Sequence, residues 1–280
     1  MLRGLYSATS GMMIEGERNR VLADNLANID TVGHKKQKVA FKSFPDIHIS
    51  RIHDRLPDEP PFTTPWDDPY IGTMGTGSLV DELFTDLSQG RLKHTGEELH
   101  VALAGPAYFM VKSPKGYRLT KDGTFHVDVD GRVVNSSSNP LMVVSGDPPQ
   151  GGTVAVNENG VAETHEFHEL YIDRKKEITI DQAGRIWEGQ NHIATIAKIA
   201  TDQTKTWRKE VNSHFKPNGA VLRFDDVVEV KQQYLELSNV NPVTEMVQMI
   251  EVQRFYEMNQ RMISSHDQSL TSLFRILQAG

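Results

Sequence analysis

Residues 241–277 read NPVTEMVQMIEVQRFYEMNQRMISSHDQSLTSLFRIL, and this stretch carries the clearer of two helical patterns in the chain. Asn241 can cap a helix and Pro242 suits its first position, because proline there loses no needed hydrogen bond. Apolar residues then recur at helical spacing, which predicts one long helix over 242–277, about 54 Å in length. The stripe comprises Met246, Ile250, Tyr256, Ile263, Leu270, Phe274 and Leu277.

The opposite end of the chain carries a second helical stripe. A helix is predicted over 2–29, and Gly33 favours a stop just beyond it. The residues that step by three or four are Leu5, Ala8, Met12, Glu15, Asn19, Leu22, Leu26 and Ile29. A narrow apolar stripe needs a partner, so each helix is expected to pack on the other terminus or on the termini of neighbouring copies. Polar residues inside both stripes favour control of register at a cost in stability.

The middle of the chain has a different pattern. Residues 34–96 are irregular and rich in proline and glycine, whereas short alternating runs after them predict strands. Asp130-Gly131 between valine pairs predicts a hairpin. The fold class expected is α+β, with long N- and C-terminal helices paired as a coiled coil and a central antiparallel all-β domain. The expected segments are 1–33, 34–96, 97–236 and 237–280.

Composition excludes several classes of function. Across 280 residues the net charge is −7, which argues against a general nucleic-acid binder. The absence of cysteine excludes disulfides, thiolate catalysis and cysteine-ligated metals. No apolar stretch is long enough for a membrane-spanning helix, so direct membrane insertion is not expected. Small and polar residues interrupt the N-terminal segment, and the charged Glu15 follows before an apolar leader core can form. No cleaved signal peptide is therefore expected.

The strongest metal candidate is His165-Glu166-Phe167-His168, with Glu163 and Glu169 beside it. A helical zinc-protease motif needs two histidines four residues apart on one face, and this spacing is three. On a strand, His165 and His168 point in opposite directions. A polar strand or loop edge is therefore the preferred interpretation, and no metal residue is predicted.

The other candidate motifs also give no support for catalysis or cofactor binding. Gly72, Gly75 and Gly77 precede neither a phosphate-binding lysine nor a helix start, so they predict a flexible turn. Asn135-Ser-Ser matches a glycosylation acceptor, a tripeptide that is common by chance. No serine lies in a nucleophile elbow. Catalytic residues, cofactor-binding residues and cofactors are accordingly predicted as none, and the chain is not expected to be an enzyme.

The two ends also resemble a known family. LRGLYSATSG (2–11) and DNLANIDTVGHK (24–35) resemble the N-terminal motif of flagellar axial proteins, and LSNVNPVTEM (237–246) resembles their C-terminal motif. TKDGTF (120–125) agrees with the middle of the same family. The chain is similar to the rod and hook proteins of the bacterial flagellum, and most similar to the proximal- and distal-rod type. It departs from the pattern at His34, at Lys121 and in the proline-rich insert 54–78, a candidate subunit-contact loop.

This resemblance implies a structural role. Family members pair their terminal helices as a coiled coil in the inner layer of a tube and carry the β-domain outside. The implied function is a polymerising subunit of the torque-transmitting basal-body rod. The implied partners are further copies of the chain, neighbouring rod and hook proteins, and the flagellar type III export apparatus, which delivers subunits beyond the inner membrane.

The stripes and motifs together give the expected assembly residues. In the N-terminal helix and its motif they are Leu5, Met12, Asn19, Leu22, Asn25, Leu26, Asn28 and Ile29. In the C-terminal segment they are Asn239, Val240, Met246, Ile250, Arg254, Tyr256, Ile263, Leu270, Phe274 and Leu277. The alternatives are a hook or hook-associated axial protein, a metal-dependent enzyme centred on 163–169, and a surface binding module.

Overall fold

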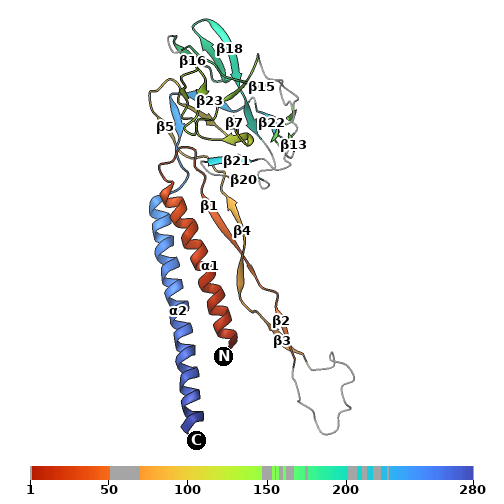
Figure 1. The fold of residues 1–280 in the computed structure, drawn as a ribbon, viewed down its shortest axis with the longest axis vertical. Coiled ribbons are helices and arrows are strands. Elements are labelled where there is room, and N and C mark those ends of the chain that lie inside the picture. Colours follow the sequence, from red (N-terminus) through yellow and green to blue (C-terminus); the bar gives the residue numbers. More distant parts are fainter. Residues whose placement is uncertain are drawn as a thin grey trace. The chain divides into compact units, whose positions relative to one another are not determined.

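The computed structural model shows an α+β fold, with two helices and a mostly antiparallel β region among the residues it describes (Figure 1). The described residues are 2–50, 70–146, 153–154, 156–157, 160–161, 167–173, 176–200, 207–209, 213–216, 222–225 and 227–279. The α+β class and the antiparallel β region predicted from the sequence are thereby confirmed. Most of the predicted insert 54–78, namely 54–69, lies outside the described residues.

The chain divides into two compact units. Residues 1–24, 38–84 and 243–280 form what we call the helical unit. Residues 25–37 and 85–242 form the sheet unit. Each unit is therefore assembled from segments that are separated along the sequence.

Two long helices supply most of the helical unit. α1 spans Leu2–Ala27 and α2 spans Pro242–Ala279. α2 begins at the proline predicted as its first residue. α1 ends before the expected residue 29, because the backbone tightens there into turns in which Asn28 N donates to Asn25 O at 3.2 Å. α1 also contains three glycines, each costing about 1 kcal/mol relative to alanine in a helix interior, so packing must hold this helix.

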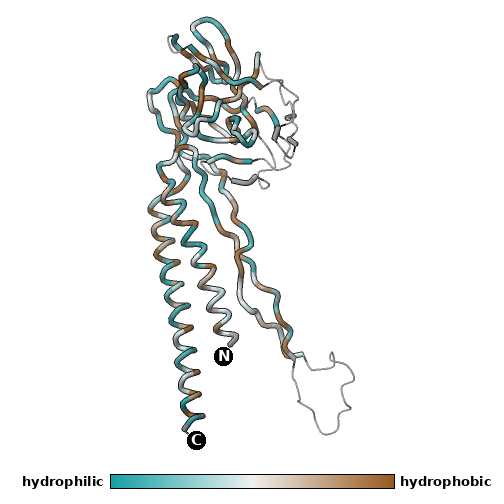
Figure 2. Tube along the Cα trace, viewed as in Figure 1, coloured by the Kyte–Doolittle hydropathy of each residue, from teal (hydrophilic) through white to brown (hydrophobic). Residues whose placement is uncertain are grey.

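Two pairs of strands complete the helical unit. β1 (Gln37–Ser43) is hydrogen-bonded to β4 (Ser78–Thr85), and β2 (Ile47–Ser50) runs antiparallel to β3 (Tyr70–Met74). A two-stranded ribbon alone is marginally stable in water, so it depends on apolar cover. Figure 2 shows hydrophobic positions recurring along these strands and along both helices. Several large ones are exposed: Phe41, Phe44, Ile47, Tyr70, Ile71, Leu83 and Phe84.

The sheet unit contains the remaining described strands. They are β5 (Leu92–His94), β6 (Val101–Ala104), β7 (Tyr108–Ser113), β8 (Gly116–Thr120), β9 (His126–Val127), β10 (Val133–Val134), β11 (Met142–Val144), β12 (Thr153–Val154), β13 (Val156–Asn157), β14 (Gly160–Val161), β15 (Phe167–Glu169), β16 (Ile178–Ile180), β17 (Arg185–Glu188), β18 (Asn191–Ile196), β19 (Lys198–Ala200), β20 (Arg208–Lys209), β21 (His214–Lys216), β22 (Leu222–Phe224), β23 (Glu229–Gln232) and β24 (Tyr234–Glu236).

These strands form two principal sheets. The larger has the order β12-β22-β19-β7-β8-β21-β20, and the smaller has the order β15-β11-β18-β17-β16. Four further pairs join β5 to β24, β6 to β23, β9 to β10 and β13 to β14. The β9–β10 pair is the hairpin predicted at Asp130-Gly131: Val127 opposes Val133, and Gly131 takes the positive φ of 80° that its turn requires.

The core of the sheet unit lies on both faces of β7. Phe109 and Val111 join one buried apolar cluster, whereas Tyr108 and Met110 join another that includes Phe215. Successive side chains of a strand point to opposite faces, so a strand buried on both faces is apolar at every position. That requirement explains the uninterrupted apolar run at 108–111.

Candidate functional site

The predicted N-terminal assembly residues differ in burial. Leu22 and Asn25 are buried, and the other six are partly buried: Leu5, Met12, Asn19, Leu26, Asn28 and Ile29. Oδ1 of Asn19 is buried without a hydrogen-bond partner among the described residues. Asn28 and Ile29 follow the end of α1, so they belong to the turn that leaves the helix.

The predicted C-terminal residues lie mostly on the surface. Val240 is buried and Asn239 is partly buried, as are Ile263 and Leu270. The exposed members are Met246, Ile250, Arg254, Tyr256 and Phe274. The side chain of Leu277 lies outside the described residues. Half of the Ile250 side chain is open to solvent, so this stripe is available for contacts beyond the chain.

Small and polar residues form the contact that α2 makes with α1. A Cβ added at Gly4 would lie 2.7 Å from Nε2 of His266, and one added at Gly11 would lie 2.9 Å from Nδ2 of Asn259. The two helices therefore run antiparallel, with glycines seven residues apart facing polar side chains seven residues apart. Val252 continues the α2 series one step further and is fully buried. The same seven-residue spacing occurs in both helices, and it is a sequence signal that the pattern of apolar residues does not contain.

The other side of α1 lines an apolar groove within the helical unit. Its volume is about 490 Å³, and its wall combines Tyr6 and Met13 of α1 with Phe44, Ile47 and Met74 of the strand ribbon. Ser10 connects the two parts, because its Oγ accepts a hydrogen bond from Ser78 N at 3.4 Å. Beside the groove, the Arg18 guanidinium lies 5.7 Å from the centre of the Phe41 ring.

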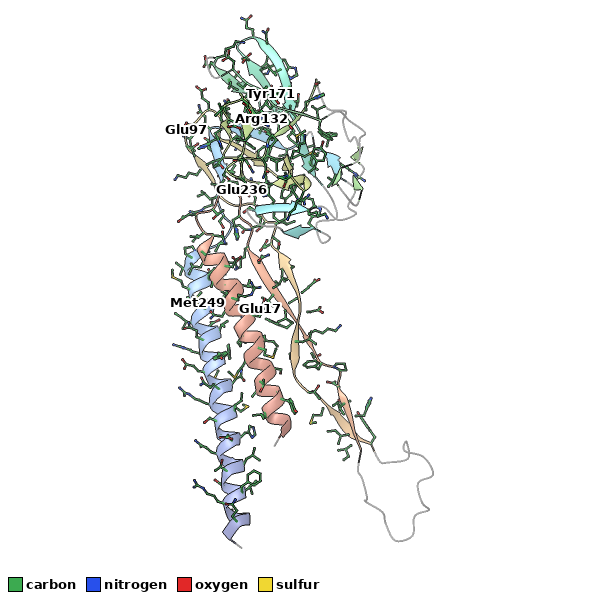
Figure 3. The ribbon with its side chains drawn as sticks, in the orientation of Figure 1. Glu17, Glu97, Arg132, Tyr171, Glu236 and Met249 are labelled. Atoms are coloured by element: carbon green, nitrogen blue, oxygen red, sulfur yellow. The ribbon has the colours of Figure 1, made fainter. Side chains whose placement is uncertain are left out.

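Charged pairs on α1 are local: Glu15 and Arg18, and Glu17 and Arg20, are each three residues apart. Arg20 Nη2 and Glu17 Oε1 lie 2.6 Å apart, and this hydrogen bond holds the pKa of Glu17 below its usual value (Figure 3). Such pairs at helical spacing stabilise a helix by about 0.2–0.5 kcal/mol. They cannot account for the order of α1, which points again to packing of its faces.

In the sheet unit, two of the predicted asparagines bridge backbone segments. Asn25 Nδ2 donates to Gln37 O and its Oδ1 accepts from Gln37 N, both at 2.9 Å. Asn239 accepts from Lys36 N at 2.8 Å and donates to Asp86 O at 2.9 Å. These side chains therefore hydrogen-bond main-chain groups at the start of β1 and just after β4.

A buried carboxylate sits beside these asparagines. Glu236, at the end of β24, pairs through Oε1 with Lys35 Nζ at 2.6 Å and through Oε2 with Lys121 Nζ at 3.2 Å (Figure 3). Gly90 N also donates to Oε1, at 2.8 Å. All three charged side chains are at most 2% exposed. Both lysines bond a carbonyl as well, Lys35 that of Ser88 and Lys121 that of Gly105.

Burial shapes the titration of this cluster. Desolvation lowers the pKa of Lys121 to about 8, although the charge of Glu236 opposes the shift. Desolvation and the same carboxylate raise the pKa of Tyr108, whose ring lies 5.3 Å from Lys121 Nζ. One carboxylate with two ammonium groups leaves a net positive charge, which the carbonyls of Ser88 and Gly105 help to solvate.

Sequence reasoning did not select this charged cluster as a site. Lys35 belongs to a short basic run and Lys121 to the TKDGTF motif, so the sequence draws attention to both lysines. Their shared partner, Glu236, is far away in the sequence. The signal that could have found them is chemical: a lysine within a motif flanked by strand residues is a candidate for a buried pair.

The metal candidate is only partly covered by the structure. Glu163, His165 and Glu166 lie outside the described residues. His168 is exposed on β15, and Glu169 pairs with Lys112 at 2.9 Å. Within the described ranges, no group of three potential ligands is placed to hold a metal ion.

Asn135, the glycosylation candidate, is fully buried, and its Nδ2 lies 3.1 Å from Nε2 of His214. Neither described helix combines the length and apolar character needed to cross a bilayer.

Comparison with protein families identifies three matching regions. Residues 5–35 match the model described as "Flagella basal body rod protein". Residues 102–188 match "Flagellar hook protein FlgE/F/G D1 domain", and residues 231–276 match "Flagellar basal body rod FlgEFG protein C-terminal". The matches follow the order of the chain and include most of α1, the strands from β7 to β17, and most of α2.

Curated relatives match over nearly the whole chain. The flagellar basal-body rod protein FlgF of Rhizobium meliloti (strain 1021) is 30% identical over 261 residues, covering 92% of this chain and 90% of the relative. FlgG of Buchnera aphidicola subsp. Schizaphis graminum (strain Sg) is 26% identical, covering 99% of this chain and all of the relative. The flagellar hook-basal body complex protein FlhO of Bacillus subtilis (strain 168) is 26% identical, with 96% of both chains covered.

The helices at both ends, the strands between them and these full-length matches lead to one assignment. The predicted resemblance is confirmed. The chain belongs to the flagellar basal-body rod protein family.

Proposed function

We propose that this protein is a structural subunit of the flagellar basal-body rod that polymerises through its terminal helices into a torque-transmitting shaft. The observation that carries the proposal is the exposed apolar stripe of α2. In the described chain, Met246 and Ile250 are each about half exposed, and other large apolar residues lie open along the same helix. Stripes of this size mark surfaces that partners cover.

Energetics support burial of this stripe in an assembly. Burying a large apolar side chain contributes about 1.5–3 kcal/mol, so a few such residues from each copy provide a substantial driving force. Because association also costs several kcal/mol in lost motion, many repeated contacts are needed. A shaft that carries torque is expected to use this kind of extended contact.

The proposal includes pairing of α1 with α2 as a coiled coil. The glycines at 4 and 11 and the polar residues at 259 and 266 repeat every seven residues, which is the heptad period. A polar series fixes register while it adds little affinity. The exposed apolar side chains of α2, such as Met246 and Ile250, are then left for neighbouring copies.

The proposed partners are further copies of this chain, neighbouring rod and hook proteins, and the flagellar type III export apparatus. The proposed location is the basal body, beyond the inner membrane. A role next to the hook is the second candidate, because one full-length relative is named a hook-basal body complex protein.

Electron microscopy of purified basal bodies tests the proposal. Antibody raised against residues 97–236 is expected to label the rod between the motor and the hook. Labelling confined to the hook would favour the second candidate. Basal bodies that retain a complete rod when this chain is deleted would contradict the proposal.

A further inference from the structure

We propose that the apolar groove on α1 receives the C-terminal end of α2 from a second copy of this chain. The inference rests on the proposed function, since it names one contact by which copies join. It is drawn from the two faces of α1 and from the unequal lengths of the two helices.

The groove has the chemistry of a site for an apolar helix end. Aromatic, methionine and isoleucine side chains surround about 490 Å³, a size within the range of small-ligand pockets. Tyr6 and Met13 are both well exposed, although they line this concave surface. A carboxylate lies near the groove: Asp46 Oδ1 is 3.7 Å from the position of a Cβ added at Gly75, which lines the groove.

The α2 helix of the same copy lies on the wrong side of α1 to fill the groove. An α-helix turns about 100° per residue. By that measure, Gly4 and Gly11, which meet α2, lie roughly opposite Tyr6, Thr9 and Met13, which line the groove. An occupant with the character of α2 must therefore come from another molecule.

Among the residues that the structure describes, no helix lies beside the last turns of α2. Gly4, near the start of α1, already faces His266, so residues 267–279 continue for about 20 Å past that contact (Figure 1). This end carries Leu273, Phe274 and Ile276, and the last two are 63% and 70% exposed. It can enter a groove without the α1 of its own copy obstructing the approach.

The C-terminal end of α2 carries a cation that complements the groove. Arg275 lies between Phe274 and Ile276, and it would bring a positive charge to the groove beside Asp46. Arg254 beside Phe255 and Arg261 beside Met262 offer a similar pair upstream, so it is the extension past His266 that selects this end of α2. An aromatic anchor in a pocket with a charged rim is the arrangement that usually dominates the energy of an interface.

The contact also determines the kind of assembly. The groove and the end of α2 are different surfaces, so each copy offers both a receptor and an insert. Contacts of this heterologous type form rings or open helical filaments, in contrast to closed twofold dimers. The inference thus specifies a filament contact.

Disulfide trapping tests the inference, and the natural chain has no cysteine to interfere. The full-length variant Met13→Cys/Phe274→Cys is oxidised under assembly conditions and separated without reductant. We expect a ladder of dimers, trimers and larger species, whereas each single-cysteine variant gives dimers at most. A fast-migrating monomer, cross-linked within one copy, would overturn the inference.

A matched pair and a charge swap sharpen the test. Met13→Cys/Ile250→Cys is expected to give no ladder; a stronger ladder from this pair would assign the groove to the upstream part of α2. Asp46→Arg or Arg275→Asp alone is expected to lower the ladder yield about threefold, and the two together to restore it. A double variant that yields no more than either single variant would overturn the inferred contact.

Sedimentation of the full-length chain distinguishes failure of the groove contact from failure of the proposed rod function. Full-length chain that forms large assemblies without cross-links at the groove overturns this inference and leaves the proposed rod function standing. Chain that neither assembles in solution nor enters basal bodies contradicts both.

Discussion

The two units of this molecule hold their apolar residues in opposite ways. The sheet unit buries them on both faces of β7, with Phe109 and Met110 fully shielded. The helical unit leaves Met246, Ile250 and Phe274 half exposed or more. The apolar side chains of the sheet unit are buried within the chain, so they stabilise its fold. Those of the helical unit stay exposed, so they are available for association.

Charge follows the same division. In the sheet unit, Glu236 and its two lysines are removed from water and depend on one another. In the helical unit, charged pairs such as Glu17–Arg20 join residues one turn apart along a helix. The comparison predicts that single substitutions affect folding in one unit and assembly in the other.

The largest expected effect is on assembly. Ile250→Asp places a charge where a neighbouring copy is proposed to pack, and an unpaired charge in such an interface costs several kcal/mol. We expect loss of rod incorporation and of swimming, with unchanged unfolding of the sheet unit. Complementation of a deletion strain measures the first two, and denaturation followed by tryptophan fluorescence measures the third.

Gln253→Asp is the matched control, because Gln253 is also exposed on α2 but is already polar. This variant is expected to swim normally. Normal swimming by the Ile250→Asp strain would contradict the proposal that the helical unit serves assembly.

The next effect is on folding. Glu236→Gln leaves two buried lysines without their carboxylate, so we expect the free energy of unfolding to fall by about 3–5 kcal/mol. Urea denaturation of the full chain measures it. Glu229→Gln, at an exposed position of β23, is the control and is expected to change stability by less than about 0.5 kcal/mol. Equal losses in both variants would contradict the buried role of Glu236.

A third prediction concerns pH. Because burial lowers the pKa of Lys121 to about 8 from 10.5, both folded and unfolded chains hold the proton below pH 8. Between about pH 8 and 10.5 the folded chain releases it first, so stability is expected to rise with pH, by about 1–3 kcal/mol. The raised pKa of Tyr108 reverses this trend above its ordinary value of 10.0. Denaturation at stepped pH should show the rise in the natural chain and none in Lys121→Met.

The smallest effect separates two glycines of α1. Gly16 has open space around its missing Cβ, so Gly16→Ala is expected to stabilise α1 by about 1 kcal/mol. Gly11→Ala must displace Asn259 and is expected to gain less. Thermal melts followed by circular dichroism compare them. Equal gains would mean that α1 and α2 do not touch at Gly11.

Local signals made much of the fold predictable. Asn241-Pro242 gave the start of α2, and Asp130-Gly131 gave the β9–β10 hairpin, because both act through the backbone of adjacent residues. The α+β class followed from the change of period along the chain. The turn that ends α1 at Ala27 was less visible, since it depends on hydrogen bonds of residues that continue the helical pattern.

The site was less predictable for a physical reason. Apolar spacing identifies a stripe but not the partner that covers it, and α2 meets α1 through Asn259 and His266. Lys35 and Lys121 look like surface residues until Glu236, 201 positions beyond Lys35, brings its carboxylate between them. The roles of the predicted stripe residues in assembly stay predictions.

The discontinuity of the helical unit has a consequence for the order of folding during synthesis. The sheet unit has all its strands once Glu236 has left the ribosome, whereas the helical unit needs residues from 243 onward. Contacts between distant segments form slowly, since a long loop must close first. α1 is therefore synthesised first, but its packing against α2 is completed last. Its apolar faces remain without α2 while more than 200 residues are translated.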